Sequence, residues 1–170
     1  MNPLVFVDKC DVGFGVFASR DIKKGETIFI FSGQIVPGDI AKLPESNAYA
    51  LQIDVDTYID PEQGLGRFIN HSCQPNAGIV ENDVVIALQD IPINAEVRFD
   101  YSTTMLERFW TLECACGASQ CRKVIEDFDL LPLALQQYYL ALGIVPDFII
   151  QQLNPVVTTK TQSLPQDTCI

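Results

Sequence analysis

The sequence of 170 residues has little positive charge and almost no histidine: 11 lysines and arginines stand against 22 acidic residues, and His71 is the single histidine. One histidine limits any mechanism that needs a pair of histidines. The formal net charge of −11 lacks the basic footprint that DNA or RNA requires, so we expect no direct nucleic-acid binding. A negative surface can steer a basic peptide toward the protein, although solubility alone is the commoner reason for an acidic composition.

Long apolar runs are also absent. The longest apolar stretch, 130–150, is interrupted by prolines, glutamines, a glycine and an aspartate, so it does not predict a membrane span. No basic leader accompanies the short apolar run at 4–7, and Cys169 lies too close to the end for a prenylation motif. We therefore expect a soluble intracellular protein, either cytoplasmic or, in a eukaryotic cell or host, nuclear.

Short apolar segments separated by turns fill the first hundred residues. Strand-like segments rich in β-branched and aromatic residues occupy 12–18, 27–31, 48–55 and 84–88. The turn residues at 37–39 predict a loop between two of them. With 48% hydrophobic residues, the chain predicts one folded domain that is mostly β and made of small sheets.

Helical spacing is confined to the C-terminal part. Apolar residues recur near a 3.6-residue period at Leu131, Leu135, Tyr138, Tyr139 and Leu142, which predicts a helix over 130–142. Gly143 suits the end of this helix, and Pro146 suits the start of a second one that runs to about Leu153. The segment 154–170 is rich in Thr, Gln and Pro, so we expect a flexible tail.

Three cysteines within eight residues, Cys114, Cys116 and Cys121, favour metal binding over disulfides in a chain without a secretory signal. A structural zinc ion prefers four ligands, so one ligand has to come from elsewhere. His71, Cys73 or a more distant cysteine could supply it, and we favour Cys73 because four thiolates would then clamp the C-terminal part onto the middle of the chain. The alternative is a group of buried apolar cysteines, and Cys10 and Cys169 have no assigned role.

Three further motifs carry little meaning when each is taken alone. The run Arg-Phe-Ile-Asn-His-Ser-Cys-Gln-Pro-Asn at 67–76 could be a structural polar turn, Glu-Val-Arg-Phe-Asp-Tyr at 96–101 a core strand, and Gly-Phe-Gly at 13–15 a close backbone approach. In this order, and together with the cysteine cluster, they resemble the SET-domain family of protein lysine methyltransferases and its post-SET zinc module. The resemblance covers about residues 4–125.

The resemblance implies a fold and a division of the chain. We expect a SET-domain fold of several small β-sheets, with a pseudoknot that brings Asn70 to Tyr101. The SET domain would span 4–112, the post-SET zinc-binding module 113–125 and a C-terminal helical extension 126–153, followed by the tail at 154–170.

The family resemblance also implies S-adenosylmethionine as cofactor and one structural zinc ion. The cofactor-binding residues would be Gly13, Phe14, Gly15, Arg67, Asn70, His71, Tyr101 and Trp110. His71 would be a binding residue and not a general base, while Arg67 could instead form a structural ion pair and Trp110 could belong to the core. The zinc ligands would be Cys73, Cys114, Cys116 and Cys121.

The family's catalytic positions match Tyr101, Tyr49 and Phe99, with Tyr58 as a competitor for Tyr49. A lysine amine has a pKa of about 10.4 in water and must be neutral to attack a methyl group. An apolar channel and a nearby sulfonium would both lower that pKa. A phenylalanine at position 99 leaves room for further methyl groups, so we expect di- or trimethylation.

The sequence departs from the family beside the catalytic residues. The segment before Arg67 is short and lacks the usual asparagine, and the segment 94–98 differs from the usual pattern. These departures bear on substrate fit. The expected partner is a lysine-containing basic protein or peptide, with histones as one candidate. The competing interpretation is a non-catalytic SET module that binds peptides or other partners.

Overall fold

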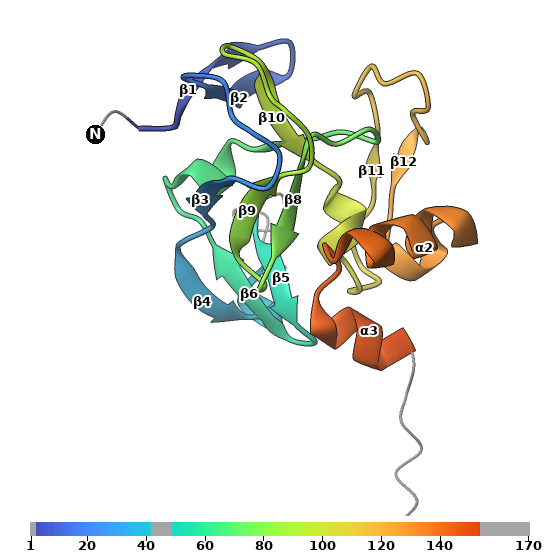
Figure 1. The fold of residues 1–170 in the computed structure, drawn as a ribbon. Helices are drawn as coiled ribbons and strands as arrows, with labels where there is room; N and C mark the ends of the chain where they lie inside the picture. The colour runs from blue at the N-terminus through green and yellow to red at the C-terminus, as the bar shows by residue number, and fades with distance from the viewer. Residues whose placement is uncertain (1–2, 42–48, 154–170) are drawn as a thin grey trace, which may run out of the picture.

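The computed structural model describes residues 3–41 and 49–153, and its strands form four small antiparallel or mixed sheets (Figure 1). The first sheet has the order β1-β2-β10-β7, with β1 at Val5–Cys10, β2 at Gly13–Ala18, β10 at Glu96–Phe99 and β7 at Asn70–His71. The second has the order β3-β9-β8, with β3 at Thr27–Ile30, β9 at Val84–Ala87 and β8 at Ala77–Val80. The third has the order β4-β6-β5, with β4 at Gln34–Pro37, β6 at Thr57–Asp60 and β5 at Leu51–Asp54; β11 (Leu112–Glu113) and β12 (Val124–Ile125) form the fourth.

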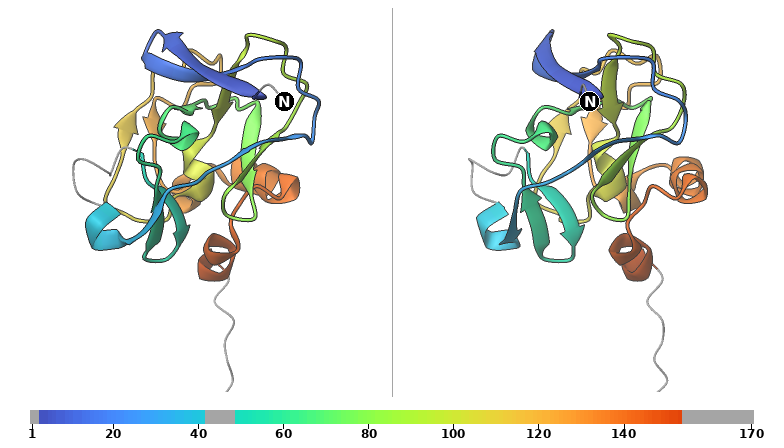
Figure 2. Two further views of the ribbon diagram at one scale, coloured as in Figure 1. Left: turned by 90° about the vertical axis from the view of Figure 1, so that its left-hand side faces the viewer. Right: turned by 60° about the vertical axis from the view of Figure 1, so that its left-hand side comes forward.

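The helices are short, and the two longest ones come after the last strand in the sequence. Three single-turn 3₁₀ helices are η1 at Leu65–Arg67, η2 at Tyr101–Thr104 and η3 at Phe128–Leu130. The α-helices are α1 at Gly38–Ala41, α2 at Leu133–Leu142 and α3 at Asp147–Leu153. The β1–β2 hairpin and α3 lie at opposite ends of the molecule in all three views (Figures 1 and 2). The predicted mostly β fold with a C-terminal helical part is confirmed.

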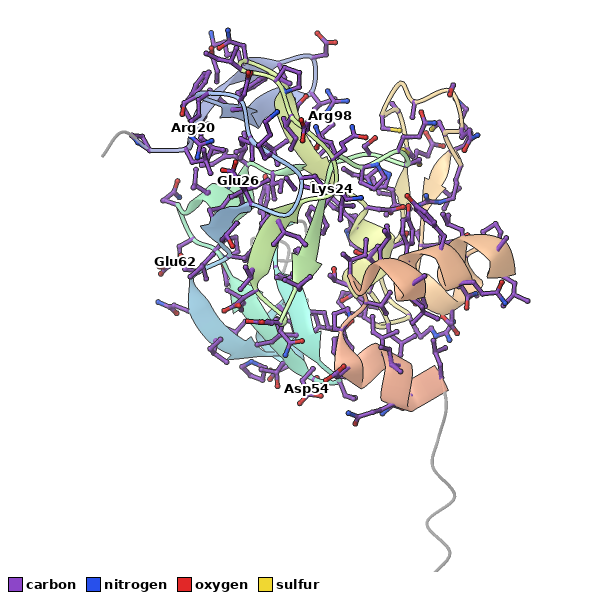
Figure 3. The ribbon with its side chains drawn as sticks, in the orientation of Figure 1. Arg20, Lys24, Glu26, Asp54, Glu62 and Arg98 are labelled. Atoms are coloured by element: carbon purple, nitrogen blue, oxygen red, sulfur yellow. The ribbon has the colours of Figure 1, made fainter. Side chains whose placement is uncertain are left out.

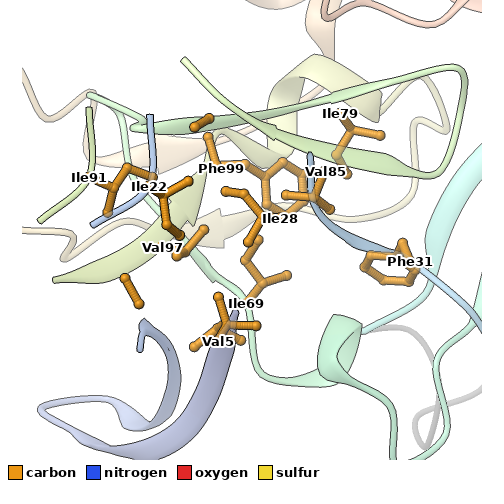
Figure 4. Packing of buried hydrophobic residues seen from close by; sticks show 14 of the residues in the cluster. Val5, Ile22, Ile28, Phe31, Ile69, Ile79, Val85, Ile91, Val97 and Phe99 are labelled. Atoms are coloured by element: carbon orange, nitrogen blue, oxygen red, sulfur yellow. The ribbon is translucent and has the colours of Figure 1, made fainter. Parts of the chain in front are cut away.

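The main core lies between the small sheets. Val16, Val85 and Val97 are fully buried, and Figure 4 shows Val85 and Val97 in one cluster with Ile28 and Phe99. These residues alternate with more exposed ones along their strands, as expected for sheets with one buried face. Each such side chain stabilises the fold by roughly 1.5–3 kcal/mol through the hydrophobic effect.

A second cluster holds the C-terminal helices against the sheets, with Phe128, Tyr139 and Ile149 at its centre. Helix α2 begins after Pro132, three residues later than predicted, because a proline is tolerated at a helix start but not inside the helix. Gly143 ends the helix with a left-handed φ of 69°, as predicted. Tyr138 differs from the prediction, since 57% of its surface is exposed.

The prediction of a loop at 37–39 was wrong, because Gly38 begins the single-turn helix α1. Pro37 directly precedes this turn and Asp39 lies within it, and both residue types suit a helix N-terminus. The predicted tail at 154–170, including Cys169, lies outside the described residues. Within the described part of the chain, no helix is long and apolar enough to cross a membrane.

Candidate active site and metal centre

The site forms where β7 runs parallel to β10. The register pairs Arg98 with Asn70 and Phe99 with His71, although these residues are 28 positions apart in the sequence. Tyr101 follows directly: its backbone N–H donates to His71 Nδ1 at 3.2 Å, and its hydroxyl donates to the Ile69 carbonyl at 2.7 Å. The predicted meeting of the Asn70 segment with Tyr101 is therefore present.

The side chain of Asn70 joins the glycine motif to this pair of strands. Its amide donates to the Phe14 carbonyl at 2.9 Å and to Glu96 Oε1 at 2.7 Å. A Cβ atom on Gly15 would lie 2.5 Å from Glu96 Oε1 and 3.2 Å from the Asn70 amide nitrogen. Gly15 is therefore required for the close approach of three segments.

A groove of about 410 Å³ opens beside Asn70 and His71. Asn70 and His71 line one side of it, and the β1–β2 turn at Asp11 and Val12 and the segment 112–117 with its cysteines line the rest. Burial lowers the pKa of the His71 imidazole to about 4; Asp100 opposes this shift, whereas Arg122 and Arg98 add to it. A neutral His71 can then bind a ligand without a charge of its own.

A second, narrower pocket of about 50 Å³ is lined by aromatic and aliphatic residues together with the polar residues Gln52, Arg67, Thr104 and Glu107. Its lining includes Tyr49, Ile69, Phe99, Tyr101 and Trp110. Such a pocket suits a long apolar side chain with one polar end.

Tyr101 is the one residue, among those described, that lines both the groove and the aromatic pocket. Burial raises the pKa of its hydroxyl above the ordinary value, and the nearby Glu96 and Tyr49 act in the same direction. The hydroxyl therefore stays protonated at neutral pH. Because its hydrogen goes to the Ile69 carbonyl, its oxygen lone pairs remain free to accept.

Tyr49 and Tyr58, the two tyrosines that the sequence offered for one catalytic position, lie in different surroundings. Tyr49 lines the aromatic pocket, with the Arg67 guanidinium 4.0 Å from its ring centre. Tyr58 is 2% exposed within the core and is not part of that lining.

Of the predicted cofactor-binding residues, Asn70, His71 and Tyr101 line the groove, whereas Arg67 and Trp110 line the aromatic pocket. Gly13, Phe14 and Gly15 line neither; they follow the turn residues Asp11 and Val12, which do line the groove.

Four potential metal ligands converge at one wall of the groove. The donor atoms of His71, Cys73, Cys114 and Cys116 all lie within 4.8 Å of one another. Cys121 is outside this tightest set, but its thiol lies 3.4 Å from the Cys114 carbonyl and forms hydrogen bonds with the thiols of Cys114 and Cys116. All four predicted cysteines are therefore within one small cluster, with His71 beside it.

The cluster favours a negatively charged sulfur. Burial opposes the thiolate of Cys116, but backbone N–H groups of Cys73 and Ala118 and the neighbouring thiols lower its pKa to about 6. Burial raises the pKa of Cys73 and of Cys114. Several thiols so close together cannot all ionise without a cation between them, and thiolates are the preferred ligands of zinc. The donor set therefore fits a metal ion.

Sequence reasoning missed the polar residues that surround the site. Glu96 and Asp100 have side chains that are 8% and 0% exposed. Arg98 on β10, which is labelled in Figure 3, pairs with Glu96. A signal was present, since charged residues at 96, 98 and 100 alternate with apolar ones and so share one face of the strand. Because Glu96 and Asp100 on that face are buried, they need polar partners, and Asp100 finds them in other segments.

Comparisons with known proteins agree with this geometry. Residues 13–102 match the SET domain, and the chain belongs to the SET-domain family. The chain is similar to the histone-lysine N-methyltransferase trr of Drosophila melanogaster, with 32% identity over 127 residues, 65% of this chain. It is also similar to the variant-silencing SET domain-containing protein of Plasmodium falciparum, with 35% identity over 130 residues, 64% of this chain.

A third relative is the H3 lysine-4 specific histone-lysine N-methyltransferase of Chaetomium globosum, with 33% identity over 139 residues, 71% of this chain. The chain spans only 5%, 5% and 13% of the lengths of these three relatives. Among solved structures, KRYPTONITE in complex with mCHH DNA, an H3(1-15) peptide and SAH has a TM-score of 0.58 at 25% identity. That alignment covers 72% of this chain and 29% of KRYPTONITE.

Proposed function

We propose that this chain is a protein-lysine N-methyltransferase that uses S-adenosylmethionine and acts on a lysine of a basic protein. The observation that carries the proposal is the position of Tyr101 between a polar groove and an aromatic pocket. Reactants held in the groove and in the aromatic pocket would both lie beside this residue. The relatives named as histone-lysine methyltransferases support the same activity.

The groove would hold the cofactor. Asn70 and the neutral His71 offer polar groups on one wall, and the β1–β2 turn offers backbone groups on the other. When bound there, S-adenosylmethionine supplies a methyl group on a positively charged sulfur. The SAH in the KRYPTONITE complex supports this ligand class.

The aromatic pocket would hold the substrate lysine. The apolar part of its wall, with Phe99 and Ile69, and the nearby sulfonium would both disfavour the charged ammonium form and so lower the pKa of the lysine amine, which loses its proton to water. Glu107 in the same lining would attract the incoming ammonium group. The Tyr101 oxygen can accept a hydrogen bond from the neutral amine and direct the nitrogen lone pair toward the groove. Alignment of the two reactants then contributes much of the rate.

One structural zinc ion would be held by Cys73, Cys114, Cys116 and Cys121. We assign His71 to the groove and not to the metal. Its Nδ1 atom accepts the Tyr101 amide, so in the neutral ring Nε2 carries the hydrogen and donates toward Cys73 Sγ at 3.3 Å instead of binding the metal. The metal would supply folding energy to the segment 113–125, which we take as a module between the SET domain at 4–112 and the helical extension at 126–153.

We propose a lysine-containing basic protein as the substrate, with histones as the first candidates. The net charge of −11 favours encounter with a basic partner, and an H3 peptide is present in the KRYPTONITE complex. Phe99 in the aromatic pocket leaves space for more than one methyl group, so di- or trimethyl lysine is the proposed product.

The proposed activity is tested by Tyr101→Phe. We expect an unchanged fold and SAH affinity but a loss of methyl transfer to core histones or to a peptide array by about 10²–10³-fold, the usual cost of one positioned polar group. Radiolabelled methyl transfer and calorimetry measure the two effects. Near-normal turnover would contradict the role of Tyr101, and a wild-type protein that binds no SAH would instead be a non-catalytic SET module.

The product is tested separately with Phe99→Tyr. The added hydroxyl takes space in the aromatic pocket, so mass spectrometry at saturating cofactor should show a shift from di- or trimethyl to monomethyl lysine. If the wild-type protein already stops at one methyl group, the proposed product is wrong.

A further inference from the structure

A buried carboxylate, Asp100, lies at the end of β10 directly before Tyr101. Its side chain is 0% exposed, and the Arg122 guanidinium donates to both of its oxygens, at 2.7 and 2.8 Å. The hydroxyl of Tyr139 donates to Asp100 Oδ2 at 2.7 Å. A buried charge is stable only when it is paired in this way, so each partner restricts how Asp100 can lie.

The three residues belong to three separate parts of the chain. Asp100 ends a strand of the main sheets, Arg122 follows the cysteine cluster, and Tyr139 lies on α2. The backbone N–H of Arg122 also donates to the Cys73 sulfur at 3.4 Å. The carboxylate therefore joins the SET domain, the segment 113–125 with its three cysteines (the cysteine module) and the C-terminal helices at one point.

The same carboxylate contacts the proposed site. Asp100 Oδ1 accepts the Ser102 N–H at 3.2 Å, which caps η2. It also lies 3.5 Å from His71 Nδ1, but this nitrogen accepts the Tyr101 N–H and so donates nothing to the carboxylate. Tyr101 is the first residue of η2, and its own N–H donates to His71 Nδ1. A shift of the Asp100 carboxylate would thus move the start of η2, and with it the Tyr101 N–H that holds the His71 ring.

We propose that Tyr139 is a positioning residue: through Asp100 it holds His71 and the Tyr101 backbone in the geometry that binds the cofactor. The C-terminal helix α2 is then a functional part of the active centre and not only a cover for the sheets. This inference rests on the proposed methyltransferase function.

The hydroxyl of Tyr139 can be separated from its ring. The ring packs in the second cluster with residues such as Phe128 and Ile144, whereas the hydroxyl alone reaches Asp100. Tyr139→Phe therefore keeps the packing and removes one hydrogen bond to a charged group. Tyr138→Phe is the matched control, because Tyr138 is the next residue on the same helix and is 57% exposed.

The first measurement is the affinity for SAH by calorimetry and the steady-state constants with S-adenosylmethionine. Compared with Tyr138→Phe, the Tyr139→Phe variant should bind SAH about tenfold more weakly and show a similar rise in KM for the cofactor, the usual size of coupling between connected sites. The kcat at saturating cofactor should change less than KM. Loss of a merely structural hydrogen bond would lower the melting temperature without this split.

The second measurement needs no activity: hydrogen exchange of the Tyr101 amide by NMR in the protein without cofactor. In Tyr139→Phe this amide should exchange about tenfold faster, since its acceptor His71 is held less firmly. The Ala87 amide, which donates to Glu26 in the main core, serves as the reference for global opening. Its exchange should rise less than that of Tyr101.

The outcomes distinguish the positioning role of Tyr139 from the proposed methyltransferase function. If Tyr139→Phe matches Tyr138→Phe in SAH affinity and in Tyr101 exchange, Tyr139 has no positioning role, whatever its melting temperature. If the wild-type chain binds no SAH, the proposed function fails, and the exchange at Tyr101 still decides whether Tyr139 holds this segment.

Discussion

The main core and the cysteine module are built in opposite ways. The core buries a continuous set of apolar side chains between three- and four-stranded sheets, with Val16, Val85 and Val97 at 0% exposure. The module has one sheet of two-residue strands, and its small buried cluster includes Cys73 and Cys114. The core is therefore stable through the hydrophobic effect, whereas the module would depend on the proposed metal ion and on the ionic contact at Asp100.

The contrast matters because the cofactor groove lies between the two regions. One wall contains Asn70 and His71 from the core sheet, and the other contains the segment 112–117 of the module. A stable wall and a metal-dependent wall predict that cofactor binding can be lost while the core remains folded. The predictions that follow test this difference.

The largest effect is expected from Cys114→Ser. Loss of one thiolate should abolish zinc binding, and SAH affinity should fall by about 100-fold or more because one wall of the groove is no longer held. Metal analysis, calorimetry and circular dichroism measure zinc, affinity and the β fold. Cys10→Ser is the control for metal content, because Cys10 lies outside the cluster. Full zinc content in Cys114→Ser would contradict the assignment of this ligand.

The stability of the main core should depend more on buried apolar side chains than that of the cysteine module does. Ile79→Ala on β8 removes buried methyl groups from a residue that is 1% exposed, so the free energy of unfolding should fall by about 2–5 kcal/mol. Leu112→Ala on β11 of the module, where 49% of the side chain is exposed, should cost about 0.5 kcal/mol or less. Urea titrations of the zinc-loaded variants measure both values. Equal losses would show that the two regions are stabilised alike.

The sequence predicted the parts of this fold that depend on local pattern. Strands at 13–18 and 84–87, the end of α2 at Gly143 and the three clustered cysteines all follow from neighbouring residues. The two-residue strand β7 could not be found in this way, because its partner β10 is distant and two residues carry no periodicity. Only the resemblance to a known family indicated that these segments meet.

The contacts of Asp100 show the same limit within the site. Arg122 and Tyr139 lie 22 and 39 residues away from it, so no spacing rule connects them. Tyr139 was predicted as an apolar position on a helix, and its ring is indeed 1% exposed, but its hydroxyl has a polar partner. Side-chain networks between distant segments depend on the completed fold, whereas the hydrophobic pattern that builds the fold is local.

Alkaline pH should weaken the main core and its junction with the C-terminal helices. Burial raises the pKa of Tyr58, Tyr101 and Tyr139 in the folded protein, whereas an unfolded tyrosine has a pKa of about 10. The unfolded state then releases protons first, so their stabilisation is complete below pH 10 and is lost as the pH rises toward the folded values. We expect the free energy of unfolding to fall by about 1–2 kcal/mol between pH 9 and 10.5.

Urea titrations at the two pH values measure this loss, and the absorbance of ionised tyrosine shows when these side chains titrate. In the folded protein the signal from the three buried hydroxyls should appear only as the chain unfolds. Ionisation of all tyrosines before unfolding would show that the hydroxyl of Tyr101 is accessible to base.

The smallest effect concerns whether the C-terminal helices unfold together with the main core. Gly143 at the end of α2 and Gly25 in a turn of the core have φ values of 69° and 85°, and a Cβ atom at either position would meet nothing within 4 Å. Alanine at each position therefore costs only the strain of a left-handed backbone, about 1 kcal/mol. If the C-terminal helices unfold together with the core, Gly143→Ala and Gly25→Ala lower the free energy of unfolding equally, and circular dichroism and Trp110 fluorescence give one transition. Two separate transitions in Gly143→Ala alone would mean that α2 can detach, and with it the Tyr139 hydroxyl, while the sheets stay folded.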